Sequence, residues 1–101
     1  MSKLYIIDVY GNPKPEEDTL AWERWFENNP KHVDRTEVGP YIISTVFLGI
    51  DHQYGKGPPI LWETMVFHNA SPGNELHMKR YSSRSEAQEG HERAILGVVQ
   101  G

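Results

Sequence analysis

The sequence predicts an α+β domain in which an antiparallel sheet packs against two helices. Two apolar runs, Tyr41–Ile50 and Ile60–His68, are rich in β-branched and aromatic residues and are separated by a loop of glycines and prolines, which is the pattern of neighbouring strands. Two further segments, near residues 19–28 and 84–97, carry apolar residues at helical spacing. Because a chain of this length has room for one domain, we expect a single domain over residues 1–101.

Upstream of the central pair, the chain predicts a strand, a helix and a second strand. Lys3–Tyr10 contains alternating apolar residues and is followed by the turn formers of Gly11–Pro13. Thr19–Asn28 is predicted as a helix, with its tryptophans, alanine and phenylalanine on one side and either Asp18 or Thr19 as the capping residue at its start. Lys31–Val38 is predicted as a weaker strand, which Gly39-Pro40 joins to the first central run.

Downstream of the central pair, the chain predicts one more strand and a longer helix. Asn69–Asn74 has the composition of a turn, and Glu75–Tyr81 is predicted as a strand of mixed polarity. Ser83 and Glu86 have the spacing of a capping box, which opens a helix to about Gly97. The order β-α-β-β-β-β-α predicts a two-layer sandwich, an antiparallel meander sheet with the two helices on one face.

The two central strands are apolar on both sides. Ile43 and Phe47 fall on one side of the first strand, whereas Ile42 and Val46 fall on the other. Antiparallel strands with one side in water usually alternate apolar and polar residues. Because the helices can cover only one side, we expect a second body on the other, most simply a second copy of the chain in a homodimer joined through the sheet face.

Composition excludes several classes of function. The chain has 10 Lys and Arg against 14 Asp and Glu, and neither half has an excess of basic residues, so we expect no binding to nucleic acid. No run approaches the roughly 20 apolar residues of a membrane span, and the apolar run at the N-terminus is too short for a signal peptide. We therefore expect a cytoplasmic protein without membrane contact. There is no cysteine, and the five histidines lack metal-site spacing, so we expect no metal and no cofactor.

The loop between the central strands is the first candidate for a binding site. It has nine residues, more than a hairpin needs, and long loops on rigid strands often carry binding groups. Its candidate contact residues are Asp51, His52, Tyr54 and Lys56. A structural interpretation also stays open, in which Asp51 caps a turn and the two prolines stiffen the entry to the next strand.

Four further candidates lie outside this loop: Trp62, Glu63, Arg80 and His91. Strand alternation places Glu63 among apolar residues, where it marks a site or forms an ion pair with Arg80, Lys79 or a histidine. His91 lies on the apolar stripe of the last helix, where a packed, hydrogen-bonded histidine is the alternative to a ligand contact. Trp62 belongs to the core unless it is exposed beside the loop, and Arg80 is a candidate phosphate contact.

Much of the chain resembles a known family. The residues that carry the likeness are Ser44–His52, Gly57–Pro59 and Glu63–Phe67, with Gly11–Pro13, Trp22–Glu27, Arg80–Ser82 and Gly90-His91. They are similar to a family of small proteins encoded by bacteriophages and their bacterial hosts. The resemblance implies a phage-encoded accessory protein in the bacterial host cytoplasm, and it implies no catalytic residues.

These observations support three hypotheses. The leading one is a non-enzymatic accessory binding protein that acts on a host protein or sequesters a small ligand, including a nucleotide-like one. The second is a hydrolase-like enzyme that uses Asp51, His52 and Glu63 as acid and base groups, which requires them to converge on one reacting atom. The third is a structural component of the virion.

Overall fold

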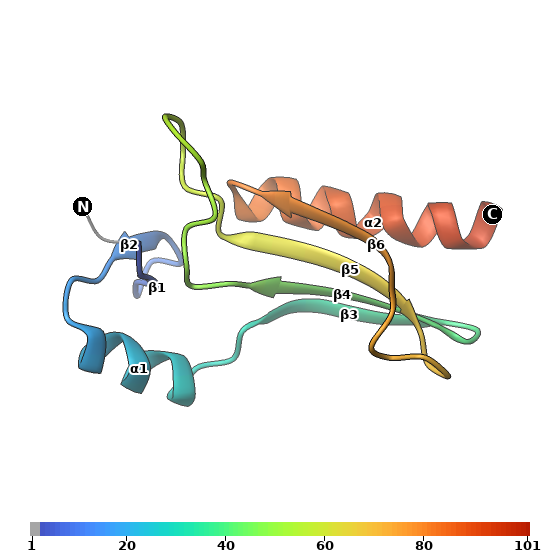
Figure 1. Cartoon of the computed structure of the whole chain (residues 1–101), viewed down its shortest axis with the longest axis horizontal. Helices are drawn as coiled ribbons and strands as arrows, with labels where there is room; N and C mark the ends of the chain where they lie inside the picture. The colour runs from blue at the N-terminus through green and yellow to red at the C-terminus, as the bar shows by residue number, and fades with distance from the viewer. Residues whose placement is uncertain (1–2) are drawn as a thin grey trace.

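The computed structural model describes residues 3–101. Its elements are β1 (Tyr5–Ile7), β2 (Pro13–Pro15), α1 (Thr19–Asn28), β3 (His32–Val38), β4 (Tyr41–Phe47), β5 (Trp62–His68), β6 (Glu75–Tyr81) and α2 (Arg84–Gln100). β3 to β6 form a four-stranded antiparallel sheet in sequence order, and β1 and β2 form a small second sheet (Figure 1). The predicted α+β class and the predicted order of helices and strands are confirmed, and β2 is an additional strand.

The sequence indicates a turn at the position of β2. Pro13 and Pro15 cannot donate hydrogen bonds to a strand ladder, so a strand is not expected there. The bonds that flank this strand run from Asp8 N–H to the Asn12 carbonyl, at 2.8 Å, and from Glu16 N–H to the Leu4 carbonyl, at 2.9 Å. The prolines fall at the alternate positions, where an edge strand needs no N–H. A proline-rich segment can therefore pair with β1.

β1 is shorter than the strand predicted over Lys3–Tyr10. The carboxylate of Asp8 accepts hydrogen bonds from the backbone N–H groups of Tyr10 and Asn12, both at 2.9 Å. An aspartate that binds the backbone two and four residues ahead turns the chain. The strand consequently ends at Ile7, and the chain folds back into β2.

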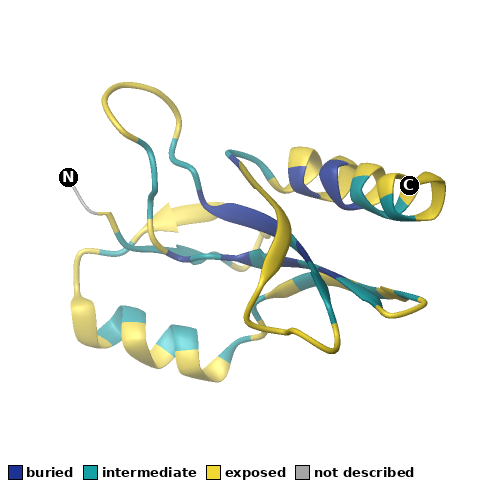
Figure 2. Cartoon of the chain, turned by 45° about the vertical axis from the view of Figure 1, so that its right-hand side comes forward, coloured by how far each residue is buried: buried dark blue, intermediate teal, exposed yellow. Residues whose placement is uncertain are grey.

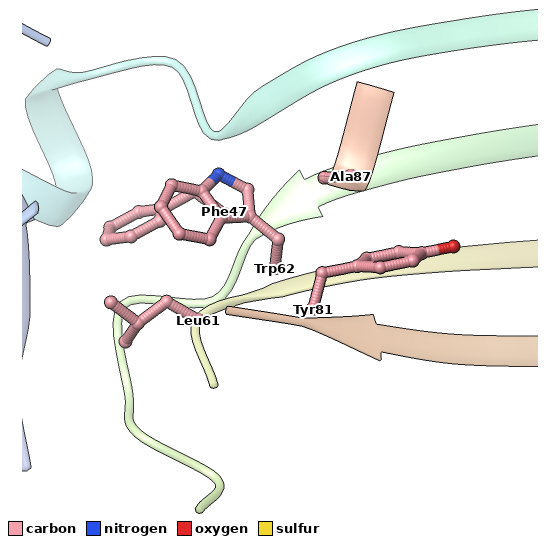
Figure 3. Close-up of a cluster of buried hydrophobic side chains, with 5 residues drawn as sticks. All are labelled: Phe47, Leu61, Trp62, Tyr81 and Ala87. Atoms are coloured by element: carbon pink, nitrogen blue, oxygen red, sulfur yellow. The ribbon is translucent and has the colours of Figure 1, made fainter. Parts of the chain in front are cut away.

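α2 covers one face of the four-stranded sheet and packs against all four strands (Figure 1). On this face, strand register places Ile43 beside Val66 and Phe47 beside Trp62. The buried apolar side chains of the domain are Ile43, Phe47, Leu61, Trp62, Val66, Tyr81 and Ala87. Figure 3 shows five of them gathered near the start of α2. The core is therefore concentrated under the first half of that helix.

α1 packs at one end of the sheet, against β1. It reaches the face covered by α2 at that end, where the Trp25 ring meets the Phe47 ring edge-on with centroids 5.8 Å apart. The indole N–H of Trp22 donates to the carbonyls of Tyr5 and Gly49, at 3.1 and 3.0 Å. One tryptophan thus ties α1 to β1 and to the segment that continues β4.

Both helices begin at the residues that the sequence predicts. The Asp18 carboxylate accepts from the N–H groups of Leu20 and Ala21, and the Ser83 hydroxyl accepts from the N–H of Glu86. Ser83 is confirmed as the cap of α2, and its hydroxyl also donates to the Glu86 carboxylate at 3.0 Å, so Ser83 and Glu86 interact as their capping-box spacing indicates. α2 continues past the predicted end near Gly97, because one glycine lowers helix propensity without ending a helix.

The opposite face of the sheet, which we call the outer face, carries Ile42, Val46, Met65, Phe67 and Met78. Within residues 3–101, neither helix lies over it, since α2 packs on the other face and α1 packs against β1. The first four residues are partly exposed and Met78 is 42% exposed. The prediction that the central strands are apolar on both sides is therefore confirmed.

Candidate functional site

The loop between β4 and β5 stands away from the sheet (Figure 1). Its base is closed by the Asp51 carboxylate, which accepts from the N–H groups of Gln53 and Ile60 at 2.7 and 2.9 Å. The N–H of His52 also donates to the carbonyl of Ile60, at 3.0 Å. Asp51 therefore has the turn-capping role that the structural interpretation predicts, and His52 lies half-buried beside it.

The tip of this loop presents two of the candidate residues to solvent. The side-chain amide of Gln53 donates to the Pro58 carbonyl at 3.0 Å, which closes the loop a second time. Beyond that bond, Tyr54 is 93% exposed and Lys56 is also exposed. A closed base with an exposed tyrosine at the tip is suited to contact with another macromolecule, because tyrosine is enriched in protein interfaces.

Glu63 and Arg80 face each other across β5 and β6 on the outer face. Arg80 Nε donates to Glu63 Oε2 at 2.8 Å, and the Glu63 side chain is 10% exposed against 38% for Arg80. Of the three partners that the sequence leaves open for Glu63, Arg80 is the one in contact. The pair neutralises a nearly buried carboxylate within an apolar surface.

The structure does not bring Asp51 and Glu63 together. Asp51 is bound to the N–H of Ile60, whose backbone lies roughly 10 Å from that of Glu63, three residues further along an extended segment. Each carboxylate also has its own partners. Among residues 3–101, no three histidine, aspartate or glutamate side chains are grouped so that they could hold a metal ion. The hydrogen bonds of Asp51 and Glu63 are thus to different partners and give no support to the convergence that the hydrolase-like hypothesis requires.

His91 has no exposed surface and anchors α2 to the centre of the sheet. Its Nδ1 lies 2.7 Å from Thr45 Oγ1 and its Nε2 lies 2.9 Å from Thr36 Oγ1. Thr45 Oγ1 is in turn 2.6 Å from Thr64 Oγ1. The Asp34 carboxylate, 3.6 Å from Nε2, favours the tautomer protonated there. In that tautomer, Nδ1 accepts from the Thr45 hydroxyl, which accepts from that of Thr64.

The order carboxylate, imidazole, hydroxyl in this cluster is that of a hydrolytic triad, but the hydroxyl is inaccessible. Thr45 is 0% exposed, and its oxygen is held between His91 and Thr64. A nucleophile must be reachable by the substrate. The cluster of Thr36, Thr45, Thr64 and His91 is therefore a structural network, and its three threonines carried no signal in the sequence.

Trp62 lies in the core and is 1% exposed, so it offers no stacking surface to a base or sugar. Its ring packs against the Phe47 ring with centroids 5.4 Å apart (Figure 3). Within the described part of the chain, its indole N–H has no hydrogen-bond partner. Trp62 and His91 are thus both interior, whereas the other sequence-predicted candidates lie on the loop or on the outer face.

The sequence did not indicate a groove of about 670 Å³ between β6 and the C-terminal half of α2. Its lining residues are Tyr41, Val66, Leu76, His77, Lys79, Tyr81, Gly90, Arg93, Ala94, Gly97, Val98 and Gly101. The first turns of α2 contain its buried residues, while the later turns are less buried (Figure 2). The missed signal was the series Gly90, Ala94 and Gly97, small residues at helical spacing on the side that faces the sheet.

Searches of protein-family models, curated proteins and solved structures found no match to this chain. The resemblance to small phage proteins therefore rests on the residues quoted from the sequence. Within residues 3–101, no helix has both the length and the apolar character needed to cross a membrane.

Proposed function

We propose that this chain is a small, non-enzymatic binding protein that works as a homodimer joined through the outer face. The observation that carries the proposal is the apolar surface formed by Ile42, Val46, Met65, Phe67 and Met78, none of which is fully buried. Exposed apolar patches on small domains commonly mark interaction sites. A second copy is the simplest partner, because a two-fold axis pairs the same surface with itself.

Two ion pairs on the outer face support self-association, because they neutralise four of its charges within one chain. Arg35 donates to Glu37 at 3.1 Å on β3, and Arg80 donates to Glu63 at 2.8 Å. Register places both pairs on the side of the sheet that carries Ile42 and Met65. Two copies of such a face meet without a large excess of one sign of charge, although the whole chain carries a net charge of −4.

The resemblance to phage proteins supports a setting in the cytoplasm of an infected bacterium, with a host protein or a small ligand as the target. Tyr54 and Lys56, at the tip of the closed loop, are the contacts we propose for a host protein. The groove beside α2 is the site we propose for a small ligand. The loop tip and the groove leave the outer face available to the second copy.

The homodimer is tested by measuring mass against concentration with analytical ultracentrifugation. We expect a dimer for the unmodified chain and a monomer for Phe67→Glu, which places a charge within the apolar surface of the proposed interface. Val9→Glu is the matched control, because Val9 is 94% exposed and lies beyond β1. A chain that stays monomeric at ~100 μM, a weak-affinity regime, would refute the homodimer.

The loop contact is tested separately with the double variant Tyr54→Ser/Lys56→Ser. We expect it to fold and dimerise like the unmodified chain, since both side chains are exposed at the tip. We expect it to lose any host protein that co-purifies in stoichiometric amount with the unmodified chain. Tyr10→Ser is the control, because Tyr10 is 85% exposed on a different turn. Equal recovery of the host protein by both variants would exclude the loop tip as the contact.

A further inference from the structure

The groove between β6 and α2 has apolar walls and a basic rim. Tyrosine, leucine, valine and alanine side chains provide much of the lining, and the lining glycines Gly97 and Gly101 are exposed. The basic side chains of the lining are His77, Lys79 and Arg93, its other titratable side chains are the phenols of Tyr41 and Tyr81, and no aspartate or glutamate is among the lining residues. This contrasts with the chain as a whole, which has 14 acidic against 10 basic residues. We propose that the groove binds a small amphipathic anion, with an apolar body and one anionic head.

The space for such a ligand comes from the small residues of α2. At Gly90 the helix lies against the Tyr81 phenol so closely that a Cβ would overlap it. At Gly97, about two helical turns further along α2, a Cβ would meet nothing within 4 Å. The helix is therefore in contact with the sheet at Gly90 and leaves open space at Gly97. The volume of about 670 Å³ is within the range of pockets that hold small molecules.

The positions of the cations along the groove indicate how the ligand lies. β6 and α2 are joined by a short turn and run in opposite directions, so Lys79 is level with the turn of Arg93 and His77 with the turn of Gly97. The C-terminus of α2 carries a partial negative charge, which disfavours an anion there. The anionic head is therefore placed between Lys79 and Arg93, and the apolar body extends toward Tyr41 and Val98.

Both cations at the head position are available to a ligand. The Lys79 ammonium lies 5.9 Å from the centre of the Tyr81 ring, on the groove side. Arg93 is 3.6 Å from Glu89, but both side chains are more than 60% exposed, and an exposed pair of this kind contributes little. Arg93 can thus give up its contact with Glu89 and bind the anionic head of the ligand at a small cost in free energy.

This inference rests on the proposed binding function but not on the homodimer, because the groove and the outer face lie on opposite sides of the sheet. The test is an NMR titration of backbone amides with three probes that share a ten-carbon chain: decanoate, decanol and decyltrimethylammonium, each below its micellar concentration. We expect decanoate to shift the amides that line the groove. We expect its affinity to exceed that of the other two by on the order of tenfold, the effect of one favourable charge contact.

Two sets of variants locate the ligand. Lys79→Gln and Arg93→Gln should each weaken decanoate binding about tenfold and leave decanol binding unchanged. Lys56→Gln makes the same change in charge on the distant loop tip and should have no effect. Gly97→Leu should abolish binding by filling the groove, and it should not lower the melting temperature, because its side chain enters open space. Gln88→Leu, exposed on the same helix, is its control.

Several results would overturn the proposal. Equal affinity for decanoate and decyltrimethylammonium would exclude an anion site, and unchanged binding by Gly97→Leu would exclude the groove. Binding of adenosine monophosphate without binding of decanoate would show that the ligand has a polar body. The Phe67→Glu monomer should bind decanoate as the unmodified chain does. If the dimer persists while decanoate fails to bind, the groove proposal is wrong and the proposed homodimer is unaffected.

Discussion

Thr45 Oγ1 lies 2.7 Å from His91 Nδ1 and 2.6 Å from Thr64 Oγ1, so that one buried hydroxyl joins α2 to both central strands. All three side chains are buried in full. Such a network fixes the position of the helix on the sheet only while each polar group has its partner, because an unpaired buried polar group is costly.

We predict that Thr45→Val lowers the free energy of unfolding by about 1–2 kcal/mol, since it leaves His91 Nδ1 and the Thr64 hydroxyl without the hydrogen bond to Thr45. The double variant Thr45→Val/Thr64→Val should cost less than the sum of the two single variants, because the second substitution removes a hydroxyl that the first has stranded. Urea denaturation of the three variants measures both quantities. Strictly additive losses would show that the hydroxyls act independently and that the network is not coupled.

Alanine substitution at the two glycines within α2 should change the free energy of unfolding in opposite directions. Gly90→Ala places a methyl group where the Tyr81 phenol lies, and we predict a loss of about 2 kcal/mol from overpacking. Gly97→Ala enters open space, and we predict a gain of about 0.5–1 kcal/mol from helix propensity. Each variant is the control for the other in thermal denaturation. A loss of stability in Gly97→Ala would mean that the groove is narrower than the structure has it.

Removing either partner of the Glu63–Arg80 ion pair on the outer face should lower the free energy of unfolding by different amounts. Removing Arg80 as Arg80→Met leaves a Glu63 carboxylate that is only 10% exposed, and we predict a loss of about 2 kcal/mol. Glu63→Gln leaves an Arg80 side chain that is 38% exposed and can turn to water, so we predict a loss below about 1 kcal/mol. Urea denaturation below the concentration of self-association compares the two. Equal losses would indicate that Glu63 is more hydrated than its burial implies.

Local sequence signals were sufficient for most of the fold. The caps at Asp18 and Ser83 and the two-sided apolar pattern of β4 and β5 correctly predicted where the helices begin and which strands are central. These features depend on neighbours in the sequence, which periodicity and capping rules describe. β2 was missed because prolines are tolerated in a strand only at positions whose N–H does not bond to the partner. Which positions these are depends on the register with β1, and the sequence of Pro13–Pro15 alone does not give that register.

The candidate site was less predictable, because it depends on contacts between distant elements. The role of His91 is set by Thr36, Thr45 and Thr64, which come from three strands. The groove lies between the later turns of α2 and β6, so the small residues of that helix indicate it only once the packing of α2 on β6 is known. Glu63 was correctly singled out by strand alternation, since a charge among apolar residues needs a partner wherever the strand lies.

Gly49 is constrained in two ways, by its positive φ and by its close contact with Phe26. Gly39 shares only the first of these constraints. Its φ is +73°, and a Cβ there would lie 2.6 Å from Cε1 of Phe26. Gly39 has φ +57°, but a Cβ would meet nothing within 4 Å. Gly39→Ala therefore reports the backbone term alone, about 1 kcal/mol.

We predict that Gly49→Ala costs about 3 kcal/mol, the backbone term plus the clash with Phe26. In a Phe26→Leu background, the additional cost of Gly49→Ala should shrink toward that of Gly39→Ala, because the shorter side chain vacates the space. Urea denaturation of the four variants gives the coupling. Equal losses of unfolding free energy in Gly49→Ala and Gly39→Ala would show that the close contact between Phe26 and Gly49 does not contribute to stability. The hydrogen bonds of the Trp22 indole would then be sufficient to hold α1 in place.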